Sequence, residues 1–394
     1  MKLKVFGPFI IVLLSVNSLA AVKSKKQSKV KVSFDASYEY KRSENLDSLS
    51  DIESLNKDGT TSIIGAELYL KSKIGKVRVK SKTQITVESL INNLYQNQDV
   101  VNEGNLDLDE RKSIFSQNIG GSYKLNKKFN MSADLEFEKT VGYFVVTKLQ
   151  ILPDGTISKD IEYNILNAKS EKIGATLSGK YKTSRKLTFY GIYRFNEYYN
   201  TDQYTFAGDQ GTNDRRINSA GVMARYKASK KLKLSTDIQA TQTLYKNRLT
   251  TLENGGFNRN GIVDRATYFD TRMGLGAKYT FVSIDFDKSQ RRDESGGGDG
   301  NNSLGAKLGL DYNVNQITLS GEYSRTVRTY TTQTATVGSD NREDNGSAVT
   351  LKVGYKLSKT FKAIASLVRS RSDSNNVFGQ NNGQTIGLRV AGAF

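Results

Sequence analysis

Apolar and polar residues alternate along most of this chain, in stretches of about ten residues. In the stretch 30–42, one face of an extended backbone would carry Val30, Val32, Phe34, Ala36, Tyr38 and Tyr40, and the other would carry Lys31, Ser33, Asp35, Ser37, Glu39 and Lys41. A period of about two residues predicts a β-strand with one apolar and one polar face. No segment has the period of an amphipathic helix, so an all-β chain is expected.

A short motif recurs between these stretches. It begins with Tyr-Lys and ends with Leu or Phe, at 123–129, 181–187, 226–232 and 355–361, with looser copies at 279–283 and 312–317 and a weak copy at 69–77. Each copy predicts a tight turn between antiparallel strands. Seven turns join fourteen strands, and one strand before and one after bring the expected total to sixteen. Eight longer polar connections are expected, at about 43–60, 89–109, 148–160, 200–216, 247–263, 288–302, 331–346 and 372–383.

The N-terminus has a different pattern. Lys2 and Lys4 precede an apolar run over 5–16, and small residues end at Ala20, which predicts a secretory signal peptide over 1–20. The Lys-rich residues 21–29 form a basic N-terminal segment, and 30–394 form one barrel domain. No later window holds about 18 consecutive apolar residues, so no membrane helix is expected after residue 20. Strands can cross a membrane only as a closed barrel.

Composition excludes most enzyme classes. The 394 residues include no His, Cys or Trp, which removes the usual general base, the thiolate nucleophile and the common metal ligands. No carboxylate spacing matches a defined calcium loop, so we expect no metal, no cofactor and no enzyme activity. The net charge of +18 is spread along the chain without a binding motif, so no nucleic-acid partner is expected either.

The whole chain after the predicted signal peptide resembles Gram-negative outer-membrane barrels of the porin type. The resemblance rests on the alternation, on short turns opposite long loops, and on the last strand, one face of which carries Ile386, Leu388, Val390, Gly392 and Phe394. It implies a transmembrane antiparallel up-and-down β-barrel in the cell outer membrane, with short periplasmic turns and long extracellular loops. A water-soluble β-sandwich or string of β-domains is the alternative, but it would place the charged strand faces in a core.

The resemblance also implies partners. In such barrels a terminal phenylalanine is recognised by the barrel-assembly machinery, so Phe394 is the expected assembly signal, although the third residue from the end is usually aromatic and is Gly392 here. Outer-membrane lipid and lipopolysaccharide would surround the barrel. A homotrimer is common among sixteen-stranded relatives.

The polar strand faces are expected to line a water-filled channel, because a barrel of about sixteen strands is too wide for side chains to fill. The expected pore-lining residues are Arg78, Lys80, Lys82, Asp134, Glu136, Glu138, Lys180, Arg194, Arg225, Lys233, Arg272, Lys307, Lys352 and Arg389. Their excess of cations predicts weak anion preference. The alternative is that many of these charges are hydrated or paired with each other across strands.

Aromatic residues beside the short turns predict an interfacial belt in the headgroup zone. Its expected members are Tyr123, Phe129, Tyr181, Tyr226, Tyr355 and Phe361. Packing within the turns, with no lipid contact, is the other explanation for these rings.

The fifth strand continues its alternation as far as Ile151, before Pro153-Asp154-Gly155 and a returning stretch over 157–166. This connection is expected either to constrict the pore or, in better agreement with its alternation, to project above the rim.

The function expected from the sequence is passive diffusion of small hydrophilic solutes through the barrel. The alternative is a non-conducting outer-membrane barrel that acts as a structural protein, adhesin or receptor through its extracellular loops.

Overall fold

The computed structural model describes residues 30–45, 56–95, 106–151, 157–160, 168–200, 214–246, 267–294, 300–334, 341–375 and 381–393. The predicted signal peptide, the basic segment 21–29, the turn at 153–155 and Phe394 lie outside the described residues. Among the residues described, no helix has the length and hydropathy needed to cross a membrane.

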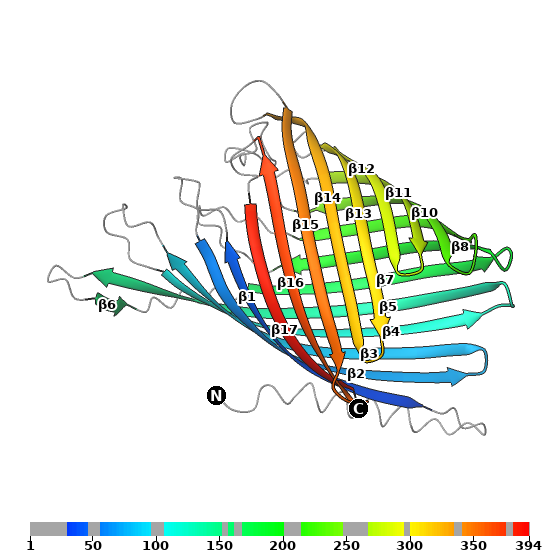
Figure 1. Ribbon diagram of the computed structural model, residues 1–394, viewed down its shortest axis with the longest axis horizontal. Helices are drawn as coiled ribbons and strands as arrows, with labels where there is room; N and C mark the ends of the chain where they lie inside the picture. The colour runs from blue at the N-terminus through cyan, green and yellow to red at the C-terminus, as the bar shows by residue number, and fades with distance from the viewer. Residues whose placement is uncertain are drawn as a thin grey trace.

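Seventeen strands make up the described structure (Figure 1). They are β1 (Lys31–Asn45), β2 (Asn56–Ile74), β3 (Val77–Tyr95), β4 (Leu106–Lys124), β5 (Phe129–Ile151), β6 (Ile157–Asp160), β7 (Ala168–Lys182), β8 (Leu187–Asn200), β9 (Arg215–Lys227), β10 (Leu232–Tyr245), β11 (Thr267–Tyr279), β12 (Val282–Asp293), β13 (Asn301–Val314), β14 (Ile317–Thr334), β15 (Asn341–Lys356), β16 (Phe361–Ser374) and β17 (Asn381–Ala393).

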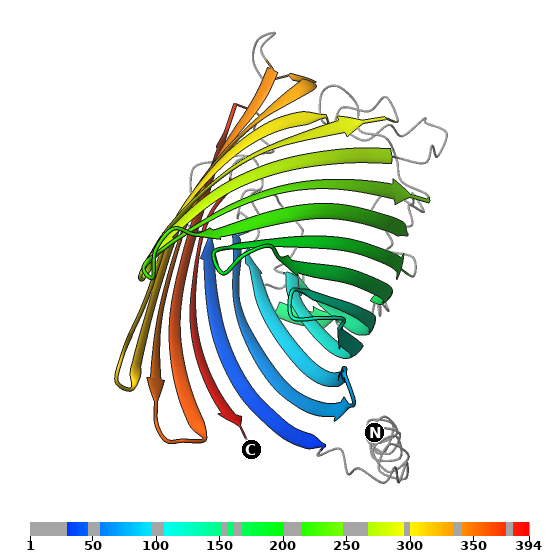
Figure 2. The ribbon, with the colours of Figure 1, turned by 90° about the vertical axis from the view of Figure 1, so that its right-hand side faces the viewer.

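The strands form one closed antiparallel barrel. Each strand of the wall pairs with the next strand of the wall, and β1 closes the wall by pairing with β17 from Asp35 opposite Ala393 to Asn45 opposite Gly383. Figure 2 shows β1 and β17 side by side in this curved wall. The strand β6 pairs only with the last residues of β5, and β7 pairs with the part of β5 nearer the short turns. The wall therefore has the predicted sixteen strands.

The seven predicted short turns are confirmed. Two-residue turns join β2 to β3, β11 to β12 and β13 to β14, and each contains a residue with positive φ, which is Gly75, Thr280 or Asn315. The four longer turns share one device, a polar side chain that accepts hydrogen bonds from the backbone N–H groups two and three residues on. The accepting residues are Asn126, Ser184, Ser229 and Ser358, at donor–acceptor distances of 2.8 to 3.2 Å.

The strands are longer than the stretches of about ten residues that the alternation suggested. Those of the wall have from 12 to 23 residues. The extra length lies at the ends away from the short turns, where the sequence indicated loops. Polar residues pair there because a strand above an apolar band still satisfies its backbone hydrogen bonds with its neighbours.

Candidate channel lining

The closed register divides the side chains of the wall into two faces. It places Asp35 opposite Glu67, Glu67 opposite Gln84, and finally Glu39 opposite Arg389. The face that carries these polar residues is the concave, inner face, because side chains of next-but-one strands meet on it. Lys80 of β3, for example, reaches Asp134 of β5 across β4, with Nζ 2.6 Å from Oδ1.

All the charged residues predicted to line a pore lie on this inner face. The register shift in the β14–β15 pair, between Thr329 and Thr334, lies beyond Lys352, and the other described pairs that contain these residues show none, so sequence parity was enough to place them. The alternative that some of these charges are paired across strands also holds in part. Six of them are joined to opposite charges, and these are Lys80, Lys82, Asp134, Glu136, Arg272 and Lys307.

Ion pairs join neighbouring strands along the inner face. Lys82 Nζ lies 3.1 Å from Glu67 Oε1, and Lys307 Nζ lies 2.7 Å from Glu322 Oε2. Arg272 lies between two carboxylates, with Nη1 3.5 Å from Asp237 Oδ2 and Nε 3.6 Å from Asp287 Oδ2.

The carboxylate of Glu136 also has a partner. Lys172 Nζ lies 2.8 Å from Glu136 Oε2. This lysine was not among the predicted pore-lining residues, although its parity on β7 matches that of Lys180. Lys172 therefore adds one positive charge to the inner face beyond those predicted, and it compensates a carboxylate that the prediction counted.

A glycine permits the pair between Lys80 and Asp134. Gly120 of β4 lies directly between them, and a Cβ at this position would collide with the Asp134 carboxylate and lie 2.7 Å from Lys80 Cε. Glycine therefore lets two side chains close over an intervening strand.

The remaining predicted cations make no ion pair with a described residue. They are Arg78, Lys180, Arg194, Arg225, Lys233, Lys352 and Arg389. Two of them lie over the ring of Tyr190, with Lys180 Nζ 5.4 Å and Arg225 Cζ 5.0 Å from its centroid. Such contacts retain the positive charge, so these residues can act on ions in the lumen.

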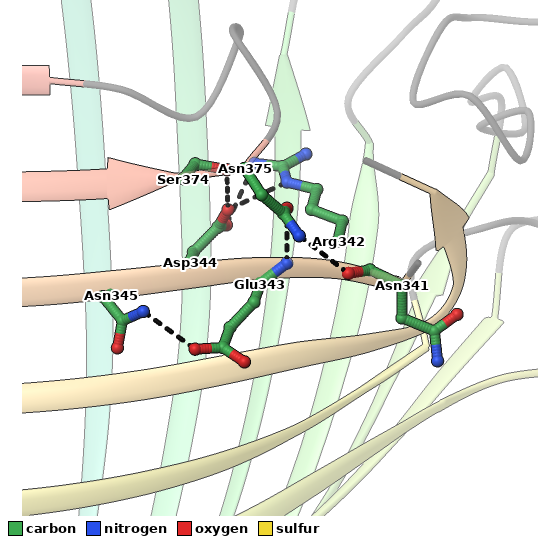
Figure 3. Close-up of polar contacts among 7 residues, drawn as sticks. All are labelled: Asn341, Arg342, Glu343, Asp344, Asn345, Ser374 and Asn375. Atoms are coloured by element: carbon green, nitrogen blue, oxygen red, sulfur yellow. Dashed lines mark hydrogen bonds and ion pairs between the residues drawn. The ribbon is translucent and has the colours of Figure 1, made fainter. Parts of the chain in front are cut away.

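At the end away from the short turns, the inner face carries a polar network that the sequence analysis missed. Arg342 donates to both carboxylate oxygens of Asp344, at 2.9 and 3.0 Å, and Ser374 of β16 donates to Asp344 Oδ1 at 2.6 Å (Figure 3). The Arg342 guanidinium lies 4.6 Å from the ring centroid of Tyr330. These partners come from β14, β15 and β16, so they fix the spacing of three strands at this rim.

A second set of contacts joins the residue after β16 to the backbone at the start of β15. Glu343 N donates to Asn375 Oδ1 at 2.8 Å, and Asn375 Nδ2 donates to the backbone oxygen of Asn341 at 3.0 Å (Figure 3). No sequence motif marked this network, because its members are distant along the chain and only the register brings them together.

The outer face of the barrel is apolar and exposed. Leu135, Leu177 and Val222 are 63%, 56% and 61% exposed. On β7 and β8 the apolar positions span about nine residues, which corresponds to roughly 21 Å along the barrel axis at a tilt of about 45°. Charged pairs follow above this band, such as Lys139 with Glu171 at 2.6 Å.

The six aromatic residues predicted to form a belt lie on this outer face, next to the short turns. The rings of Phe129 and Tyr181 are neighbours, with centroids 6.5 Å apart. Their contact with lipid remains a prediction.

The connection after β5 is a two-stranded extension. Lys148 to Ile151 of β5 pair with Ile157 to Asp160 of β6, and Figure 1 shows the two strands running outward beyond the rim. This placement agrees with a projecting hairpin.

Within the described part of the chain, no group of three or more acidic side chains is arranged to hold a metal ion.

No family model matches the sequence, and no curated protein matches it. Among solved structures, the chain is similar to Pseudomonas aeruginosa OpdQ at 9% identity, covering 93% of this chain and 97% of that one, with a TM-score of 0.47. It is similar to Acinetobacter baumannii OccAB2 at 10% identity, with 92% and 98% covered and a TM-score of 0.49. A mutant of the monoaromatic hydrocarbon channel TodX matches at 11% identity, with 93% and 91% covered and a TM-score of 0.45. The barrel assignment rests on the strand register of this chain itself.

Proposed function

We propose that this chain is an outer-membrane channel for the passive diffusion of small hydrophilic solutes. The observation that supports the proposal is the division of one closed wall into an exposed apolar outer face and a charged inner face. Sixteen strands enclose more space than their side chains fill. A wall of this kind separates lipid from water on its two sides.

Lipid is the solvent that suits the outer face. Soluble monomers rarely expose contiguous apolar patches larger than about 600 Å², whereas here exposed apolar side chains occur on nearly every strand around the barrel. Insertion would proceed through the barrel-assembly machinery, with Phe394 as its signal. Lipid and lipopolysaccharide would then cover the apolar band.

The proposal includes weak anion preference. Lys80, Lys82, Arg272 and Lys307 are neutralised by carboxylates in the pairs described above, and the unpaired cations on the same face leave a positive balance. Rings of fixed charge lower the barrier for ions of the opposite sign. Because the anion preference depends only on the cations that form no ion pair, it is expected to be modest.

Planar-bilayer recording of the purified barrel tests the proposal. Stable open steps, with a reversal potential in a KCl gradient displaced toward that of chloride, are the expected result. A barrel that inserts but gives no current would instead be a non-conducting structural protein, adhesin or receptor. A chain that remains folded and monodisperse in buffer without detergent would refute membrane insertion itself.

A further inference from the structure

Five cations lie close together on one part of the inner face. Lys31 of β1, Lys71 and Lys73 of β2, and Arg78 and Lys80 of β3 lie together near the short turn that joins β2 to β3. We call these five residues the cationic patch. All five are exposed, and they line a hollow of about 410 Å³ together with Ser72, Val79 and Ser122.

The register places like charges directly opposite one another in this patch. Lys31 is opposite Lys71, Lys71 is opposite Lys80, and Lys73 is opposite Arg78. Residues so paired have Cβ atoms about 5 Å apart, and like charges at that separation destabilise a sheet. The arrangement is therefore unfavourable unless an anion compensates it.

In the described structure one carboxylate forms an ion pair with the patch. Asp134 pairs with Lys80, whereas Lys31, Lys71, Lys73 and Arg78 form no ion pair with any described residue. Higher on the same wall, Lys82 is satisfied differently. It donates to Glu67 at 3.1 Å and to Gln84 at 3.0 Å, so the unbalanced charge is confined to the end near the short turn.

We propose that the cationic patch binds a soluble polyvalent oxyanion of the phosphate class, one that carries several negative charges on a compact group. The inference rests on the proposed channel, because the patch lines its lumen. A monovalent ion would compensate one of the four cations that form no ion pair with a described residue, whereas a diphosphate group reaches several at once. Arg78 offers a fork of N–H donors suited to phosphate oxygens, and Ser122 adds a hydroxyl. The hollow lies within the range of volumes of small-molecule sites.

The source of the anion is the aqueous lumen. The patch is on the inner face, with the wall between it and the apolar outer face, so a lipid headgroup in the surrounding bilayer does not reach it. A soluble anion that enters from the end with the short turns meets the patch first.

Pyrophosphate added to the short-turn side of a planar bilayer tests the inference. The parent channel is expected to show block of the KCl current by pyrophosphate at concentrations at least tenfold lower than those of nitrate. The triple variant K71Q/K73Q/R78Q should raise the blocking concentration at least tenfold. Gel mobility of the folded barrel checks that this variant still assembles.

A matched control removes the same charge from elsewhere at the same end of the inner face. The triple variant K182Q/K227Q/K356Q changes residues of β7, β9 and β15 that are one position from their short turns. Block should remain within twofold of the parent value. Equal loss of block in both triple variants would mean that the overall potential of the mouth, and not a site, is responsible, and would overturn the inference.

Failure of the site and failure of the channel give different results. An open parent channel that pyrophosphate does not block refutes the site and leaves the proposed function intact. If the parent gives no current, equilibrium dialysis of pyrophosphate against the detergent-solubilised barrel decides the question. Binding that the K71Q/K73Q/R78Q variant lacks and the control retains supports the site, and absence of binding to the parent refutes it.

Discussion

A single arginine on either face of one strand tests whether the outer face lies in lipid. Leu177 and Thr176 are neighbours on β7, with Leu177 on the outer face and Thr176 on the inner face between Asp134 and Arg194. Leu177 is five residues from the end of β7 at Lys182, which places it roughly 12 Å above the short turns. That depth is near the middle of an apolar band about 25 Å tall.

Arginine at the middle of a bilayer destabilises a barrel by about 2 to 4 kcal/mol. Leu177→Arg should therefore lower the folding equilibrium constant roughly 30- to 700-fold. Since the leucine is 56% exposed, little of this change would come from lost protein packing. Thr176→Arg, which adds the same group to the wet face beside Asp134, should change stability by less than about 1 kcal/mol.

Urea titration of the barrel in lipid vesicles measures both values. The chain has no tryptophan, so the folded fraction is best obtained from the mobility of the unheated barrel in a gel. If Leu177→Arg is no more destabilising than Thr176→Arg, the outer face does not lie in lipid. If Thr176→Arg is the more destabilising change, the two faces have been assigned in reverse.

Three further changes test the wall and its extension. Arg272→Gln would leave Asp237 and Asp287 uncompensated, so the reversal potential in a KCl gradient should move toward that of potassium; an unchanged value would show that this cluster lies outside the conducting path. Gly120→Ala would force Asp134 away from its lysine partner, and urea titration should show a loss of about 1 kcal/mol, whereas unchanged stability would mean that the pair contributes nothing. Deletion of 145–160 should leave the single-channel conductance unchanged, since a large change would mean that the hairpin enters the pore.

The barrel itself could be predicted from the sequence because its physical basis is local. Alternation fixes the face of each side chain, and each short turn fixes the pairing of the two strands beside it. Asn126 and Ser184 occupy the same position in the repeated motif because each caps the backbone of its own turn. Counting these turns was therefore equivalent to counting strands.

The partners of each charge could not be predicted in the same way. Lys80 meets Asp134 only because Gly120 of the intervening strand carries no side chain, and that coincidence depends on the register of three strands. The predicted strand ends were also wrong. Polar residues at the rim away from the short turns belong to paired strands, although their hydropathy does not distinguish them from loop residues. The alternation of Lys71 and Lys73 places both lysines on the inner face, but only the register of β1, β2 and β3 shows that they lie opposite Lys31, Lys80 and Arg78.

The pairing of β1 with β17 constrains how the barrel folds. Asp35 and Ala393 lie at opposite ends of the described chain, yet they face each other across one ladder. Until those two ends meet, both edge strands present unpaired backbone groups to which another copy can add. Ring closure across so long a separation is slow, so a nascent chain needs shielding in transit, and aggregation should be the main fate of any copy whose final strand is truncated.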